Sequence, residues 1–74
     1  MNKRMMIYLS ENQDITDFMR LHIKNTINKR YKIKHLAEDM NVSYPMMNRF
    51  INSKPVGQHF FVQWFDFFSK DFVD

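Results

Sequence analysis

Apolar residues recur along this chain with the spacing of α-helices. Between residues 11 and 29, one helical arc gathers the apolar side chains and the opposite arc gathers charged and amide side chains. The apolar arc holds Ile15, Phe18, Met19, His22, Ile23, Thr26 and Ile27. The polar arc holds Asp14, Asp17, Arg20, Lys24 and Asn28. This pattern predicts an amphipathic helix over about 11–29, with Ser10 and Gln13 forming a capping box at its start.

Two short helices are predicted next. The first is indicated by apolar residues with i, i+3, i+4, i+7 spacing, which are Ile33, Leu36, Ala37 and Met40. Asn41 suits the left-handed position that ends such a helix. Ser43 is a favourable N-cap for the second helix, and Pro45 lies in its first turn, where a missing N–H does little harm. The segment NSKPVG at 52–57 ends the second helix.

The last predicted helix, over residues 58–72, carries more aromatic side chains than one face can hold. Its inner stripe consists of Phe61, Trp64, Phe65, Phe68 and Phe72. Phe60 and Phe67, seven positions apart, form a second apolar ridge. Because an exposed apolar ridge usually marks a partner surface, we expect Phe60, Trp64 and Phe67 to lie in a homodimer or partner interface on this helix.

The four helices predict an all-α, compact four-helix domain over residues 10–74, preceded by a short N-terminal extension over residues 1–9. A chain of 74 residues has room for one hydrophobic core. It has no cysteine, which excludes disulfides and thiolate metal sites. No apolar run approaches the length of a membrane span, so we expect no membrane association and a cytoplasmic location.

Residues 33–52 meet the requirements of a helix-turn-helix. This motif needs a small residue where the two helices cross, a turn residue that accepts positive φ, and apolar residues that pack both helices. Ala37 is the small residue and Asn41 is the turn residue. The packing set is Leu36, Met40, Val42, Met47 and Phe50. The four-helix domain is therefore predicted to be a helix-turn-helix domain.

The motif consists of "LA" at 36–37, Met40, and "NVS" at 41–43. It resembles the Xre/Cro-like family of phage repressors, and the resemblance covers about residues 32–68. In this family the second helix of the motif reads DNA, so the resemblance implies DNA binding through residues 43–52. It also implies a transcriptional repressor of a phage or mobile element, which blocks polymerase by occupying its operator and uses no cofactor.

The resemblance also implies which side chains contact double-stranded DNA. Base contacts are expected from Tyr44, Pro45, Asn48, Arg49 and Asn52. In the major groove, arginine pairs with guanine and asparagine pairs with adenine. Phosphate contacts are expected from Lys29, Arg30, Lys32, Lys34, Ser43 and Lys54. A homodimer would present two such surfaces, and a protein antagonist could regulate it.

The distribution of charge agrees with a polyanionic partner. The chain has a net charge of +3, but residues 24–54 carry seven basic and two acidic side chains. The segments on either side of this stretch have no basic excess. Clustered positive charge suits nucleic acid, although a simple solvated face is equally common in a small protein.

No group of residues predicts catalysis or metal binding. Glu38 and Asp39 are adjacent and lie on different helix faces, and the three histidines lack metal-ligand spacing. We therefore expect a non-enzyme without a metal. Two other kinds of binding protein stay open. The apolar run YPMM at 44–47 favours a protein-interaction module or a phage-encoded inhibitor of a host protein, and the basic stretch with exposed aromatics suits an RNA binder.

Overall fold

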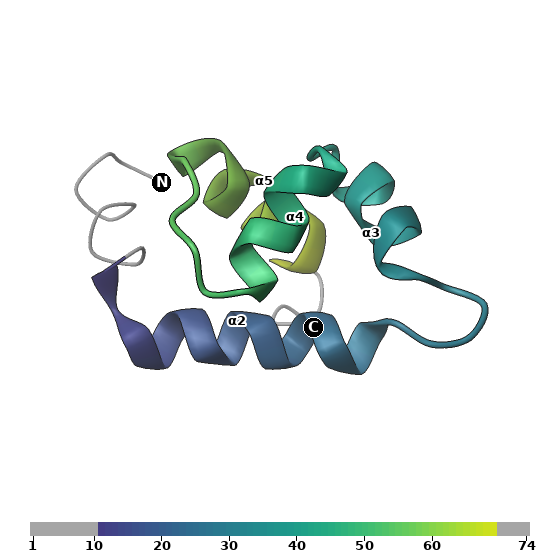
Figure 1. The fold of residues 1–74 in the computed structure, drawn as a ribbon, viewed down its shortest axis with the longest axis horizontal. Helices are drawn as coiled ribbons and strands as arrows, with labels where there is room; N and C mark the ends of the chain where they lie inside the picture. The colour runs from purple at the N-terminus through teal and green to yellow at the C-terminus, as the bar shows by residue number, and fades with distance from the viewer. Residues whose placement is uncertain (1–10, 70–74) are drawn as a thin grey trace.

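A computed structural model describes residues 11–69, and these residues form four α-helices without a strand. The helices are α2 (Gln13–Thr26), α3 (Ile33–Met40), α4 (Tyr44–Ile51) and α5 (Gln58–Phe68). α2 runs along one edge of the molecule, and α3, α4 and α5 gather on the same side of it (Figure 1). The predicted all-α, four-helix domain is confirmed. The expected extension over residues 1–9 lies outside the described residues.

α2 is shorter than the predicted helix at both ends. Its N-cap is Asn12, whose Oδ1 accepts the N–H of Ile15 at 3.1 Å. The predicted cap, Ser10, lies outside the described residues. The helix ends at Thr26, because Asn28 Oδ1 then accepts the backbone N–H groups of Arg30 and Tyr31 and closes a turn.

The turn between α3 and α4 forms as the sequence predicts. Asn41 has φ 61° and ψ 42°, in the left-handed region. The N–H of Asn41 donates to the Glu38 carbonyl and that of Val42 to the Ala37 carbonyl, each at 3.0 Å. These two bonds satisfy carbonyls at the end of α3 in a Schellman motif. Ser43 then caps α4 by accepting the Met46 N–H at 3.2 Å, and Pro45 lies in the first turn.

α4 ends in a second left-handed turn, which the sequence does not predict. Ser53 has φ 62°, and its N–H donates to the Phe50 carbonyl at 3.1 Å. The Lys54 N–H donates to the Arg49 carbonyl at 2.8 Å. The pattern repeats that at the end of α3, but with serine, which favours this conformation less than glycine or asparagine.

The core is drawn from all four helices. Its fully or almost fully buried apolar residues are Met19, Ile23, Leu36, Ala37, Met40, Met47, Phe50, Phe60, Phe61, Trp64 and Phe68. The predicted small residue of the helix crossing, Ala37, is 1% exposed, and α3 contacts both α4 and α5. No helix within residues 11–69 is both long enough and apolar enough to cross a membrane.

The predicted partner surface on α5 is wrong for two of its three residues. Phe60 and Trp64 are both 0% exposed, and Phe67 is partly buried against the core. The Phe60 ring lies 4.4 Å from that of Phe50, measured between centroids. Because α5 contacts α2 through Phe68, α4 through Phe60, and also α3, it buries a broad arc of its circumference instead of a single stripe.

The inward face of α2 also differs from the prediction. Thr16, Met19 and Ile23 are buried, whereas Phe18, placed in the apolar arc, is 50% exposed. Arg20, placed in the polar arc, has a side chain that is only 13% exposed. The inward face is therefore rotated toward Arg20 relative to the predicted apolar arc. Arg20 faces inward because its side chain reaches the Phe50 carbonyl near the end of α4. A helical wheel of α2 alone does not show this contact.

Candidate nucleic-acid interface

The outer face of α4 carries the predicted base-contact residues. Met47 and Phe50 are buried and anchor the helix to the core. Away from them, Pro45, Arg49 and Asn52 are exposed and Asn48 is half-buried. Tyr44, at the start of the helix, is 46% exposed. The fold therefore keeps all five predicted base-contact residues outside the core.

Two of these five side chains are engaged in holding the end of the helix. The guanidinium of Arg49 donates from Nε and Nη2 to the Pro55 carbonyl, at 3.1 and 2.9 Å. Asn52 Nδ2 donates to the Asn48 carbonyl at 2.9 Å. Arg49 therefore holds the loop that follows α4, a role that its position in the sequence does not predict. The side chains of Tyr44, Pro45 and Asn48 make no hydrogen bond to another described residue, so they are available on the outer face of α4.

The predicted phosphate contacts fall into two groups. All six residues are exposed, namely Lys29, Arg30, Lys32, Lys34, Ser43 and Lys54. Four of them lie in the loop before α3 or in its first turn, at the far end of the molecule from the start of α2 (Figure 1). Ser43 precedes α4, and Lys54 follows it. Positive charge thus flanks the α3–α4 unit at both ends and is not gathered in one patch.

The basic loop before α3 is fixed by Tyr31. The Tyr31 hydroxyl donates to Asp39 Oδ2 at 2.5 Å. The backbone carbonyl of Tyr31 accepts the Asn28 N–H at 2.9 Å. The ring of Tyr31 stacks on His35, with centroids 6.4 Å apart. His35 Nδ1 in turn accepts the Lys32 N–H at 3.2 Å. The lysines of this loop therefore project from an ordered turn. No sequence pattern pairs Tyr31 with Asp39, since they meet only after the turn has formed.

Tyr31 makes the stability of the fold depend on pH in the alkaline range. Burial, the hydrogen bond to Asp39 and the charge of Asp39 together raise the pKa of Tyr31 from 10.0 to about 12. Below pH 10 both the folded and unfolded states keep the phenol proton. Above it the unfolded state loses the proton first, so the free energy of unfolding is expected to fall as the pH rises from about 10 to about 12.

Urea unfolding at several pH values measures this alkaline fall in the free energy of unfolding. Tyr31→Phe should cost about 1 kcal/mol at neutral pH and should flatten the alkaline fall. Tyr44→Phe, which removes an exposed hydroxyl, should keep the wild-type fall. An equally steep fall in Tyr31→Phe would mean that another group causes it.

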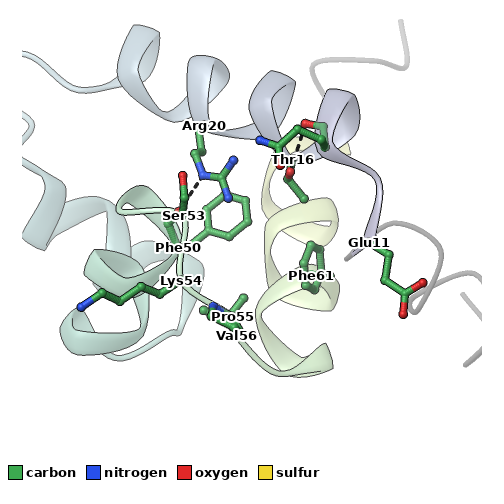
Figure 2. A pocket seen from close by; sticks show the side chains of 10 residues that line it. Glu11, Thr16, Arg20, Phe50, Ser53, Lys54, Pro55, Val56 and Phe61 are labelled. Atoms are coloured by element: carbon green, nitrogen blue, oxygen red, sulfur yellow. Dashed lines mark hydrogen bonds between the residues drawn. The ribbon is translucent and has the colours of Figure 1, made fainter.

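Arg20 holds α4 in place from α2. Its Nε donates to the Phe50 carbonyl at 2.7 Å, and its Nη1 lies 2.9 Å from Asp17 Oδ1. The guanidinium carbon is 4.7 Å from the centroid of the Phe50 ring. Figure 2 shows this side chain reaching across from α2 toward Phe50. Arg20 lines a hollow of about 320 Å³ together with Lys54 and Phe61. Arg20 thereby links α2 to the C-terminal half of α4.

No family model, characterised protein or solved structure matched this chain when they were compared. The Xre/Cro-like resemblance therefore stays a prediction, based on residues 36–43 and the turn at Asn41. Within residues 11–69, no three histidine or carboxylate side chains are placed to hold a metal ion.

Proposed function

We propose that the protein is a sequence-specific regulator that binds double-stranded DNA through α4. The observation that carries the proposal is the α3–turn–α4 unit. Asn41, at φ 61°, ends α3 so that Ser43 can cap α4 two residues later. A helix-turn-helix presents the N-terminal part of its second helix to the major groove. In this protein that part carries Tyr44 and Pro45, and Asn48 follows one turn later on the same side of α4.

The charge around α4 supports the same proposal. The sequence has no acidic residue between Asn41 and Gln63, a stretch that includes α4 and the loop after it. Lys54 lies in this stretch, and the exposed lysines and arginine at 29–34 lie before it. If about six phosphates are neutralised, the logarithm of affinity should fall with the logarithm of salt with a slope of about −5.

The proposed regulator is a cytoplasmic homodimer that represses by occupancy. A two-fold dimer would place two α4 helices on the half-sites of a pseudo-palindromic operator, and polymerase would be obstructed. It would use no cofactor and catalyse no reaction. Its activity would be set by concentration or by a protein antagonist.

Selection of bound fragments from sheared genomic DNA at physiological salt tests this proposal. We expect recovery of one short site with two-fold symmetry, bound with the salt dependence given above. Recovery of fragments without a shared sequence would refute sequence-specific binding, and no recovery at all would refute DNA binding.

Asn48→Ala is expected to weaken binding to the selected site by about 1 to 3 kcal/mol, which is roughly a 5- to 150-fold loss of affinity. The reason is that Asn48 carries the available carboxamide on the outer face of α4, where it can pair with adenine. Base preference should relax at one position. Fluorescence anisotropy with the selected duplex measures both effects.

Two control variants separate base contacts from other contributions. Gln58→Ala removes an exposed carboxamide from α5 and should leave affinity unchanged. Lys34→Ala should weaken binding to all sequences alike and reduce the salt slope by about one. The assignment of α4 as the reading helix fails if Asn48→Ala and Gln58→Ala bind equally well.

The exposed aromatic ring at the start of α4 favours a second candidate, a protein-interaction module that inhibits a host protein. Tyr44 is 46% exposed, and Pro45 beside it is also exposed. Aromatic anchors of this kind dominate protein interfaces. For such a module, Tyr44→Ala should abolish capture of the protein partner, while Lys34→Ala should leave it intact. A DNA-binding regulator would respond to both.

A further inference from the structure

α2 has an outer face that points away from α3, α4 and α5 (Figure 1). Its inner face, at Thr16, Met19 and Ile23, is buried in the core. Directly opposite on the helical wheel stands a stripe of exposed residues, which are Asp14, Phe18, Leu21 and Asn25. Their separations of four, three and four positions are those of the seam between two packed helices.

The middle of this stripe is apolar. Phe18 is 50% exposed and Leu21 is 55% exposed. The other large apolar side chains exposed to this degree within residues 11–69 are Tyr44 and Val62, each on a different helix. Phe18 and Leu21 lie on adjacent turns of one helix and form a continuous patch, which is the kind of surface that marks a contact with a partner.

We propose that a second copy of this chain packs its α2 antiparallel against this face. A two-fold axis between Phe18 and Leu21 would place each Phe18 on Leu21 of the other copy. Farther from the axis, Asp14 would lie opposite Asn25 of the other copy, whose amide can donate to the carboxylate. Both pairs of residues occur again on the other side of the axis, as an isologous interface requires.

The order of charges along α2 selects the antiparallel arrangement. Asp14 and Asp17 lie in the N-terminal half and Lys24 lies in the C-terminal half. In an antiparallel pair Asp17 comes beside Lys24 of the other copy at both ends of the interface. Asp17 already accepts hydrogen bonds from Gln13 and Arg20, but a carboxylate has about four acceptor sites. A parallel pair would instead oppose like charges.

The length of α2 limits the strength of this dimer. A helix of 14 residues is about 21 Å long, so the interface is smaller than the roughly 1,200 to 2,000 Å² that stable complexes bury. We therefore expect a dimer that forms at high protein concentration. This inference supplies a surface for the homodimer in the proposed function, but it rests on the α2 face alone and is tested without DNA.

Sedimentation equilibrium over protein concentrations from about 10 μM to about 1 mM tests the proposal. The average mass of the wild type should rise from 9.1 kDa toward twice that value. Leu21→Asp should keep the monomer mass throughout, whereas Val62→Asp, which changes an equally exposed residue of α5, should associate like the wild type. A monomer at every concentration overturns the proposal, as does dissociation by Val62→Asp instead of Leu21→Asp.

A second variant guards against a folding defect in Leu21→Asp. Asn25→Asp would face Asp14 of the other copy and should weaken the dimer several-fold without changing an apolar residue. Combining it with Asp14→Lys restores opposite charges and should restore association. If Asn25→Asp has the wild-type dissociation constant, the proposed pairing of Asp14 with Asn25 is wrong.

Disulfide cross-linking tests the direction of the helices, because the chain has no cysteine of its own. Mixing Asp14→Cys with Asn25→Cys under mild oxidation should give a cross-linked heterodimer at least about tenfold faster than Asp14→Cys alone gives a homodimer. Equal rates, or faster cross-linking of Asp14→Cys with itself, overturn the antiparallel arrangement.

Discussion

Replacing Phe60 with alanine is expected to lower the free energy of unfolding by about 3 to 5 kcal/mol. Phe60 is 0% exposed, and its ring lies 4.4 Å from Phe50 and 6.0 Å from Phe61 between centroids. The variant loses both the transfer free energy of the ring and its packing, and it leaves a cavity. For a domain of this size such a loss approaches the whole stability, so the variant should be partly unfolded at room temperature.

Two further variants make this result interpretable. Phe60→Leu fills most of the space and should remain folded with a loss of about 1 kcal/mol, measurable by urea unfolding. Phe18→Ala removes a half-exposed ring of the same kind from α2 and should cost about 1 kcal/mol at low protein concentration. Similar losses for Phe60→Ala and Phe18→Ala would contradict the burial of Phe60 in the core.

Arg20→Ala is expected to cost about 2 to 3 kcal/mol, which is large for a residue in the polar arc of a helical wheel. The main contribution is the hydrogen bond from Nε to the Phe50 carbonyl at 2.7 Å, because the guanidinium is charged and only 13% exposed. Its position over the Phe50 ring adds a cation–π interaction. The ion pair with Asp17, which is 58% exposed, adds little.

The controls for Arg20 separate its geometry from its charge. Arg20→Lys keeps the charge but loses the planar fork and should recover less than half of the loss. Arg30→Ala removes an exposed arginine from the basic loop and should change stability by less than about 0.5 kcal/mol. Thermal and urea unfolding measure these differences. Equal stability of Arg20→Ala and Arg30→Ala would mean that Arg20 does not hold α4.

The Arg20 contact also matters for the proposed function. A reading helix must be held at a fixed angle to the rest of the protein if its side chains are to meet base edges. α4 is only eight residues long and is fixed at its start by Ser43 and beyond its end by Arg49. Arg20 adds a contact between α4 and α2. Loss of Arg20 should therefore weaken specific binding more than non-specific binding.

The elements predicted correctly from the sequence depend on contacts between near neighbours in the chain. The turn at Asn41 is closed by hydrogen bonds to Ala37 and Glu38, and Ser43 caps α4 through Met46. All these partners lie within five positions of one another. Such bonds form whenever a suitable residue stands at the right position, so residue type and spacing determined the four helices and the α3–turn–α4 unit.

The burial and exposure of several side chains were predicted wrongly, because they depend on tertiary structure. Phe60 and Trp64 are buried because α5 meets three other helices, and Phe18 is exposed because the inward face of α2 turns toward Arg20. Arg49 is exposed as expected, but its contact with the Pro55 carbonyl depends on the path of the loop after α4. A helical wheel shows which side chains share a face, but only the packing of distant segments determines how much of the circumference each helix buries.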